Sequence, residues 1–218
     1  MTKIDTLHSG TRESLLDAAE RLFSERGIQA ASLRAITEEA GANLAAVHYH
    51  FGSKHGLVRA VFARRLAPLN AERLRLLDEC EATGGGIEGV LRAFIEPHLG
   101  MTELDNSAFG QLMGRAFMEP DDEVREILIE QIQEVFHRFT AALARLLPHL
   151  SEPEILRRFH FVAGAIGHTV VCGPLLERLS AGRCRVGGAT EAIDPLVTFL
   201  AAGLQAPAPA AARPDRNL

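Results

Sequence analysis

The sequence predicts an all-α protein with a small N-terminal helical domain and a larger C-terminal one. Apolar residues recur at three- and four-residue spacing over most of the 218 residues, which is the pattern of amphipathic helices. The alternating pattern of strands is missing from the sequence. An apolar content of 47 % is ordinary for a globular core, so we expect the chain to fold without disulfides or structural metals.

Three short helical patterns follow one another before residue 55. Thr11 is expected to cap the first helix. Ser32 caps a second helix that ends at Gly41, and Asn43 caps a third that ends at Gly52. Two short helices joined by a tight turn form a helix-turn-helix, whose second helix can enter the major groove of DNA while the first crosses the backbone.

The rest of the chain also has helical periodicity. A fourth helix is expected from Lys54 to about residue 82, with Pro68 kinking or interrupting it. The tripeptide 84–86 is all glycine and predicts a loop rather than a phosphate cradle, because no strand precedes it and no Lys-Ser/Thr follows. Pro97 and Pro195 are expected near helix ends. The further predicted helices lie near 87–99, 105–118, 122–147, 153–180 and 190–204.

These patterns divide the chain into a helix-turn-helix domain at 1–55, a larger helical domain at 56–205 and a disordered tail at 206–218. The sequence has no apolar run long enough to span a membrane and no signal-peptide pattern, which indicates a cytoplasmic protein. Cys80, Cys172 and Cys184 lack CxxC spacing. Their number and spacing favour reduced thiols over a disulfide framework or a zinc site.

The charge is unevenly distributed along the chain. The net charge of −5 does not by itself indicate a nucleic-acid partner. Residues 1–66 nevertheless contain nine basic and seven acidic side chains, so this part carries +2 and the remainder −7. This asymmetry has the sign expected if the N-terminal part meets phosphate and the acidic remainder does not.

The stretch NLAAVHYHFGSK predicts the DNA-reading surface. At about 100° per residue, Leu44, Val47 and Phe51 share an inward face, while the two alanines, Tyr49 and His50 point outward. Small residues let a helix lie deep against base edges, and hydroxyl and imidazole groups can bond phosphate. The candidate DNA contacts are Ser32, Arg34, Asn43, Leu44, Ala45, Ala46, His48, Tyr49, His50 and Lys54.

Two cations among these candidates have different expected roles. Lys54 and the amide groups of its helix N-terminus suit phosphate. Arg34 can read guanine through O6 and N7, and a phosphate contact is an equally open alternative. His48 and His50 form an HxH pair, but residues two apart on a helix face different directions, so no metal site is expected.

The residues from TRESLLDAAERLFSERG through SLRAITEEAGANLAAVHYHFGSKHGLVRAVF resemble the DNA-binding domain of TetR-family transcriptional regulators. The shared pattern is a LxxAxxLFxxxG helix, an xIAxxAGVSxxxxYxHF helix pair and a GSKxxL helix start. It covers about residues 11–62, with departures at Thr37, Ala42, Asn43-Leu44 and His48. The resemblance implies a homodimer in which the last two helices of each subunit form a four-helix interface, and a ligand pocket in the C-terminal domain.

Three later segments resemble the fatty-acid-responsive regulators of the PsrA type: FGQLMGRAF at 109–117, EVFHRFTAALARLLP at 134–148 and RRFHFVAGAIGHTVV at 157–171. This resemblance implies a fatty acid or acyl-CoA effector. Arg115 is the preferred candidate for the head group, since it can bond a carboxylate bidentately. The expected pocket residues are Phe94, Phe109, Gln111, Leu112, Met113, Arg115, Phe117, Phe136, Phe139, Phe161 and His168.

The helix predicted at 153–180 is apolar nearly all round and contains the small residues Ala163, Gly164, Ala165 and Gly167. We therefore expect it to be buried on more than one side and to allow close helix approach.

The expected function is that of a ligand-responsive repressor whose dimer binds a pseudo-palindromic operator and is released when an apolar effector moves the fourth helix. The alternative is a constitutive DNA-binding regulator without a small-molecule effector. An enzyme is not expected, because the sequence has no GxSxG, HExxH or P-loop motif and its Glu and His residues occur singly in helical patterns. No cofactor or metal is expected either.

Overall fold

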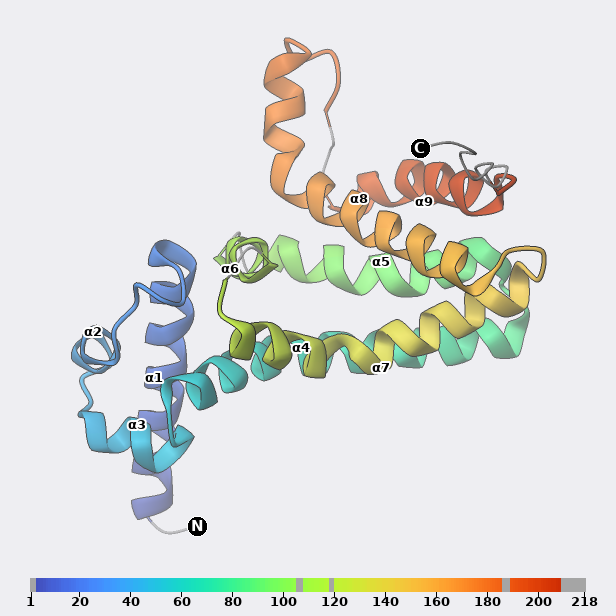
Figure 1. The fold of residues 1–218 in the computed structure, drawn as a ribbon. Coiled ribbons are helices and arrows are strands. Elements are labelled where there is room, and N and C mark those ends of the chain that lie inside the picture. The colour runs from blue at the N-terminus through green and yellow to red at the C-terminus, as the bar shows by residue number, and fades with distance from the viewer. Residues whose placement is uncertain (1–2, 105–107, 118–119, 186–188, 209–218) are drawn as a thin grey trace, which may run out of the picture.

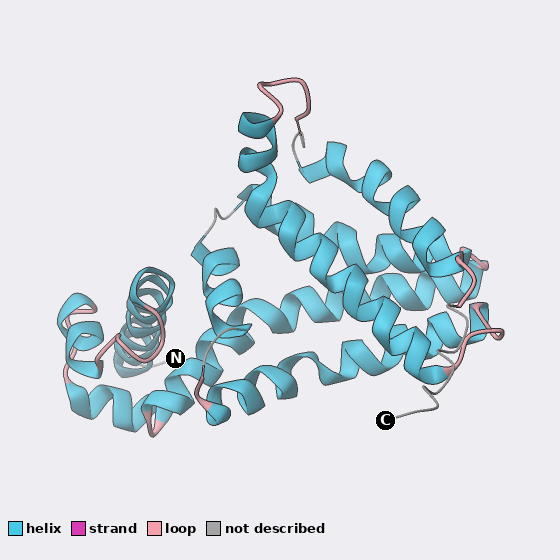
Figure 2. Cartoon of the chain, turned by 45° about the horizontal axis from the view of Figure 1, so that its top comes forward, coloured by secondary structure: helices cyan, strands magenta, loops and turns pink. Residues whose placement is uncertain are grey.

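A computed structural model of the chain shows an all-helical molecule in two parts. It describes residues 3–104, 108–117, 120–185 and 189–208, and every regular element in these ranges is a helix (Figure 2). The helices α1 (Lys3–Arg26), α2 (Leu33–Glu39) and α3 (Leu44–Phe51) form a compact unit at one end of the molecule. Helix α4 (Lys54–Thr83) leads from this unit into the larger part (Figure 1).

The larger part is a bundle in which α4 packs along both α5 and α7, and α9 packs along α5. Helix α8 crosses over this layer, and the short helix α6 packs against α1 (Figure 1). The bounds of these helices are α5 (Gly86–Leu104), α6 (Ala108–Phe117), α7 (Asp122–Leu146), α8 (Glu152–Leu179) and α9 (Ala189–Gln205).

The buried apolar side chains form two clusters, and α4 contributes to both. The N-terminal core contains, among others, Leu15, Leu16, Leu22, Phe23, Ile36, Val47, Leu57, Val61, Phe62, Leu112 and Val124. The C-terminal core contains, among others, Leu77, Leu91, Phe94, Ile95, Phe139, Leu143, Phe159, Val162, Val197 and Leu200. Because α6 and α7 also reach the N-terminal core, the small unit is packed onto the larger part and does not stand apart from it.

The predicted caps of the helix-turn-helix are confirmed. The Ser32 hydroxyl accepts a hydrogen bond of 3.2 Å from the amide of Ala35, and Asn43 Oδ1 accepts one of 3.0 Å from the amide of Ala46. The predicted start of the first helix is wrong, because α1 begins at Lys3 and Thr11 lies inside it.

The prolines interrupt the helices less than expected. Helix α4 continues through Pro68 and ends at Gly84, whose φ of 70° is left-handed. Pro97 and Pro195 lie inside α5 and α9, so the prediction that they fall near helix ends is wrong. Helices α4 and α9 bury apolar side chains on both sides of their prolines, and that burial offsets the loss of one backbone hydrogen bond.

Residues 209–218 of the predicted tail lie outside the described ranges. Within the ranges, no helix combines the length and the apolar character that a membrane crossing requires. The three cysteine thiols are free.

Candidate nucleic-acid interface

The turn between α2 and α3 is held by local hydrogen bonds. Gly41 has a φ of 62°, a left-handed conformation that suits glycine. The Ala42 amide donates to the carbonyl of Thr37 over 2.9 Å, which closes the turn. The Thr37 hydroxyl is buried and donates to the Arg34 carbonyl over 3.0 Å. A threonine therefore fits where the family pattern has alanine, because its hydroxyl is satisfied within its own helix.

The outward face of α3 is polar and aromatic. Tyr49 is 76 % exposed, and its ring makes an edge-to-face contact with half-buried His50 at a centroid distance of 4.9 Å. His48 Nδ1 lies 2.9 Å from the Gly52 carbonyl, so Nδ1 is the donor and carries the proton. This bond fixes the imidazole ring at the end of the helix.

Two residues of α3 lie differently from the prediction. Leu44 is 49 % exposed, because it is the first residue of the helix and no neighbouring element covers it. Ala46 is half-buried against the N-terminal core instead of pointing outward. Val47 is buried and Phe51 is half-buried, as their predicted inward positions require. Leu44 and Ala45 are thus the exposed apolar groups at the start of the helix.

The junction of α3 and α4 is tighter than the sequence predicts. A Cβ at Gly56 would lie 1.9 Å from the carbonyl oxygen of Phe51, so only glycine fits there. The Gly56 amide donates to the hydroxyl of Ser53, the N-cap of α4, over 3.0 Å. A glycine in the first turn of a long helix is unfavourable for helix formation. The presence of Gly56 at this position is therefore the sequence feature that indicates a close backbone contact.

The start of α4 is also tied to the loop before α2. Lys54 Nζ donates to the carbonyl of Gln29 over 3.0 Å, and the side chain is half-buried. An ammonium group has further donors, so this bond places the positive charge beside α3 without excluding a phosphate contact. Ser32 and Arg34, at the start of α2, are exposed.

A buried carboxylate fixes α1 to α4. Glu20 on α1 is buried, and its Oε1 lies 2.7 Å from Arg65 Nη2 and 2.9 Å from Arg65 Nε. Its Oε2 accepts from Arg64 Nη2. A second cation, Arg12, lies over the Phe51 ring at 5.6 Å and ties α1 to the end of α3.

The first turn of α4 is linked to the larger part of the molecule through α7. His55 Nε2 lies 3.2 Å from Asp121 Oδ2, and His55 Nδ1 lies 3.0 Å from Glu123 Oε2. The hydrogen bond from His55 lowers the pKa of Asp121. One turn later, Arg59 forms an ion pair with Glu130 of α7. A movement of α7 would therefore act on the first turns of α4, next to α3.

The expected effector residues lie in several different places. Leu112 is buried in the N-terminal core, with Phe109 and Met113 half-buried against it. Phe94 and Phe139 are buried in the C-terminal core, and Phe136 packs against them.

Other expected effector residues lie at the surface, or their side chains are not among those that the structure describes. Phe161 and His168 are exposed on α8, and exposed Arg115 points toward Gly27 at the end of α1. The side chains of Gln111 and Phe117 lie outside the described part of the structure.

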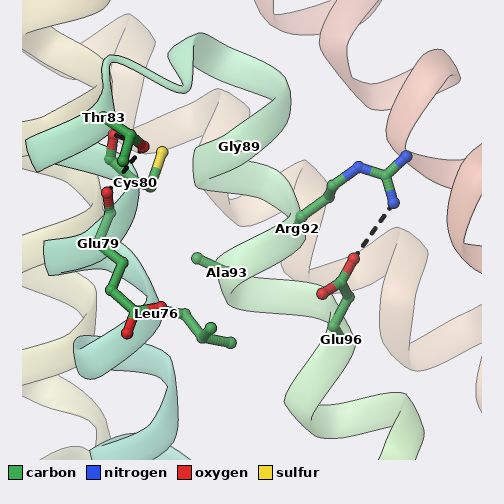
Figure 3. A pocket seen from close by; sticks show the side chains of 8 residues that line it. All are labelled: Leu76, Glu79, Cys80, Thr83, Gly89, Arg92, Ala93 and Glu96. Carbon is green, nitrogen blue, oxygen red and sulfur yellow. Dashed lines mark hydrogen bonds and ion pairs between the residues drawn. The ribbon is translucent and has the colours of Figure 1, made fainter.

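A shallow groove of about 310 Å³ lies between α4 and α5 (Figure 3). Leu76 and Cys80 of α4 line one side of the groove, and Arg92 and Glu96 of α5 line the other. Arg92 Nη1 lies 3.2 Å from Glu96 Oε1. The expected effector residues do not line this groove. Across the described residues, no cluster of three or more His, Cys, Asp or Glu side chains could hold a metal ion.

Two family models match the chain. The model described as bacterial regulatory proteins, tetR family, matches residues 15–61, which contain α2, α3 and the start of α4. The model described as the tetracyclin repressor-like C-terminal domain matches residues 92–203. The chain belongs to the TetR family. The resemblance seen in the sequence is thereby confirmed at the level of the family.

Curated relatives of this TetR-family chain match it over short stretches. The nicotine-responsive transcriptional repressor HdnoR of Paenarthrobacter nicotinovorans is 43 % identical over 70 residues, which are 32 % of this chain and 36 % of the relative. The transcriptional repressor KstR2 of Rhodococcus jostii is 44 % identical over 50 residues, 23 % of this chain and 24 % of the relative. The chain thus spans about a third or less of these relatives' lengths.

Solved structures match almost the whole TetR-family chain at low identity. The regulator FadR of Bacillus subtilis, solved with stearoyl-CoA, has a TM-score of 0.68 at 13 % identity and covers 88 % of this chain and 98 % of that one. The regulator PfmR of Thermus thermophilus has a TM-score of 0.61 at 20 % identity, and the match covers 91 % of this chain and 98 % of that one. These likenesses establish the all-α fold with an N-terminal helix-turn-helix.

Proposed function

We propose that this chain is a ligand-responsive transcriptional repressor that binds a pseudo-palindromic DNA operator as a homodimer. The supporting observation is the α2–α3 pair, in which capped helices present exposed Tyr49 and His48 beside Lys54. Such a helix fits the major groove while the cations and helix N-termini around it meet phosphate. Selection of genomic fragments by the purified protein tests this function, and failure to enrich a palindromic site would refute it.

The dimer is supported by an unpartnered apolar face on the last two helices. Phe161 and Leu179 of α8 are 60 % and 75 % exposed, and Phe199 of α9 is 73 % exposed. The small residues Gly164 and Gly167 are exposed on α8 as well. This helix was expected to be buried on more than one side, and a second copy of the chain would cover the side that lies open here.

The proposed effector is a long-chain acyl compound, either a fatty acid or its CoA ester. The support is the run of aromatic side chains in the C-terminal core, where Phe94, Phe136, Phe139 and Phe159 lie with ring centroids 5.0 to 6.3 Å apart. Aromatic side chains are typical of the walls of sites that bind apolar ligands. The effector releases DNA if it binds the DNA-incompetent arrangement of the dimer more tightly.

An operator-binding titration with oleate and with oleoyl-CoA tests the effector class. Lower operator affinity in the presence of either compound supports it. An unchanged affinity with both compounds would favour a constitutive regulator and leave the DNA-binding function intact.

The role of Lys54 in phosphate contact leads to a salt-dependence prediction. The substitution Lys54→Ala should weaken binding to operator and to unrelated DNA alike, and it should reduce the slope of log affinity against log salt by about one unit. Affinity is measured by fluorescence anisotropy over a range of salt concentrations. An unchanged slope would contradict the phosphate contact, and Lys54→Arg should retain it.

Arg34 distinguishes base readout from phosphate contact. Its side chain is exposed at the start of α2, where the guanidinium can reach either a guanine edge or the backbone. The affinity of Arg34→Ala is measured against a set of single-base operator variants. A loss of preference at one base pair, worth about 1 to 3 kcal/mol, indicates readout. A uniform loss across all variants indicates phosphate contact.

A further inference from the structure

A buried arginine in the C-terminal domain lacks a carboxylate partner. Arg73, on α4, is 8 % exposed, and among the described residues no acidic side chain lies within ion-pairing distance of it. Burial lowers its pKa to about 10, so the guanidinium is still charged at neutral pH. A buried charge without a counter-ion is costly, and proteins normally pair it.

A second buried arginine shows what full pairing looks like in this fold. Arg158 on α8 is equally buried, at 6 % exposed, but its Nε donates to Glu154 Oε1 over 2.8 Å. Its Nη1 also donates to the carbonyls of Leu204 and Ala206 over 2.7 and 2.6 Å. Arg158 is therefore paired with a carboxylate as well as with backbone carbonyls, whereas Arg73 has no carboxylate partner among the described residues.

The known contacts of Arg73 leave most of its guanidinium unused. Nε donates to the backbone carbonyl of Phe94 over 2.9 Å, and Cζ lies 4.1 Å from the centroid of the Phe94 ring. This carbonyl lies in the turn of α5 that precedes Pro97, so the bond from Nε ties α4 to α5. The two Nη groups have no acceptor among the described residues, and they form the fork that binds a carboxylate bidentately.

Two polar side chains near Arg73 also lack full compensation by partners among the described residues. Asn70, three residues earlier on α4, is 9 % exposed; its Nδ2 donates to the Gln131 carbonyl over 2.7 Å, but its Oδ1 has no donor. Burial and the charge of Arg73 lower the pKa of His98 on α5 to about 4, so this imidazole is neutral at pH 7. The region thus has an uncompensated positive charge beside the rings of the C-terminal core.

We propose that Arg73 binds the carboxylate of an unesterified acyl ligand whose chain lies against Phe94 and the neighbouring rings. This inference rests on the proposed function and assigns the head-group site to Arg73 in place of Arg115, which is exposed and lies near Gly27. The carboxylate supplies a counter-ion that Arg73 does not have among the described residues. Arg73 shares one continuous helix with Lys54, so a ligand at this position acts on the helix that begins beside the DNA-reading surface.

The test measures binding of oleate, methyl oleate and oleoyl-CoA to the full chain by titration calorimetry. The substitution Arg73→Met removes the charge at similar volume and should weaken oleate binding at least about tenfold, the effect of a lost charged hydrogen bond. Methyl oleate, which lacks the carboxylate, should bind both proteins alike. Arg75→Met is the matched control, since Arg75 is exposed on the same helix and is paired with Glu72 and Glu79.

A second readout does not require Arg73 to be replaced. A carboxylate bound to Arg73 offsets the positive charge that helps to lower the pKa of His98, so oleate should raise that pKa, as followed by NMR of the imidazole. Equal oleate affinity of Arg73→Met and wild type, or an unmoved His98 pKa, overturns the assignment. Binding of oleoyl-CoA without oleate also overturns it but preserves the acyl effector; if no acyl compound releases the operator, the proposed effector class fails with it.

Discussion

The two cores of this molecule differ in how their buried charges are paired. In the N-terminal core, the carboxylate of Glu20 lies between the guanidinium groups of Arg64 and Arg65. In the C-terminal core, Arg73 has one backbone acceptor and no carboxylate among the described residues. The paired site holds the DNA-binding helices in one arrangement. The unpaired site leaves a free-energy cost that a suitable anion would relieve.

This difference agrees with the roles we propose for the two parts. A surface that reads DNA must keep its helices fixed relative to one another, and it gains from satisfied polar groups. A site that responds to a ligand must be stabilised when the ligand binds. The predictions below test this contrast in order of decreasing expected effect.

The largest effect is expected at the paired site. Glu20→Ala removes the carboxylate shared by Arg64 and Arg65, and it should lower the free energy of unfolding by about 3 kcal/mol, since two partly buried cations lose the buried partner that they share. Urea denaturation measures the change. The control is Glu13→Ala, because Glu13 is exposed and lies 3.6 Å from Arg64. A loss at Glu20 no larger than at Glu13 would remove the contrast between the cores.

A smaller effect is expected from the neutral imidazole of the unpaired site. The pKa of His98 is about 4 in the folded chain and near its ordinary value of 6.5 when unfolded, so the unfolded state binds the proton first as pH falls. Stability should therefore decrease as pH falls from about 6.5 toward 4. Between neutral pH and about pH 4.5, the wild-type chain should lose about 2 kcal/mol of its free energy of unfolding through His98, and His98→Gln should abolish this loss.

Thermal unfolding of both proteins across that pH range measures the His98 effect. Exposed His160 provides the control substitution, His160→Gln. An identical pH dependence of His98→Gln and wild type would show that His98 is not held neutral beside Arg73.

The smallest effect is expected at a single helix cap. Asn43→Ala removes the acceptor for the Ala46 amide at the start of α3, and it should cost about 1 kcal/mol of stability. Asn43→Ser should recover most of this loss, because serine can cap the same amide. If Asn43→Ala lowers operator affinity while stability is unchanged, the side chain acts on DNA rather than on the helix.

The DNA-binding end could be predicted from the sequence because its signals are local. Ser32 and Asn43 cap their helices as expected, since a cap depends on residues three positions away. The exposure of Leu44 was missed because a helical pattern does not show where the covering elements end. Gly56 was missed because its neighbour is a backbone carbonyl, which side-chain patterns do not reveal.

The C-terminal domain was predictable in its helices but not in its contacts. Phe94 and Phe139 share a core although they are far apart in the sequence, while Phe109 belongs to the other core. The burial of Arg73 has a local signal that its charge conceals, since Arg73 lies at four-residue spacing from buried Leu69 and Leu77, whereas Arg75 faces another direction. Which arginine becomes buried is decided by the packing of α5 and α7 on α4.

The passage of α4 through both cores has a consequence for how the chain folds. Leu57 and Phe62 complete the N-terminal core, and Leu77 on the same helix belongs to the C-terminal core. Neither core keeps all of its buried surface if this helix unravels, so we expect the two parts to melt as one cooperative unit. The backbone amides in the middle of α4 should then exchange with solvent only through global unfolding, and they should be among the slowest to do so.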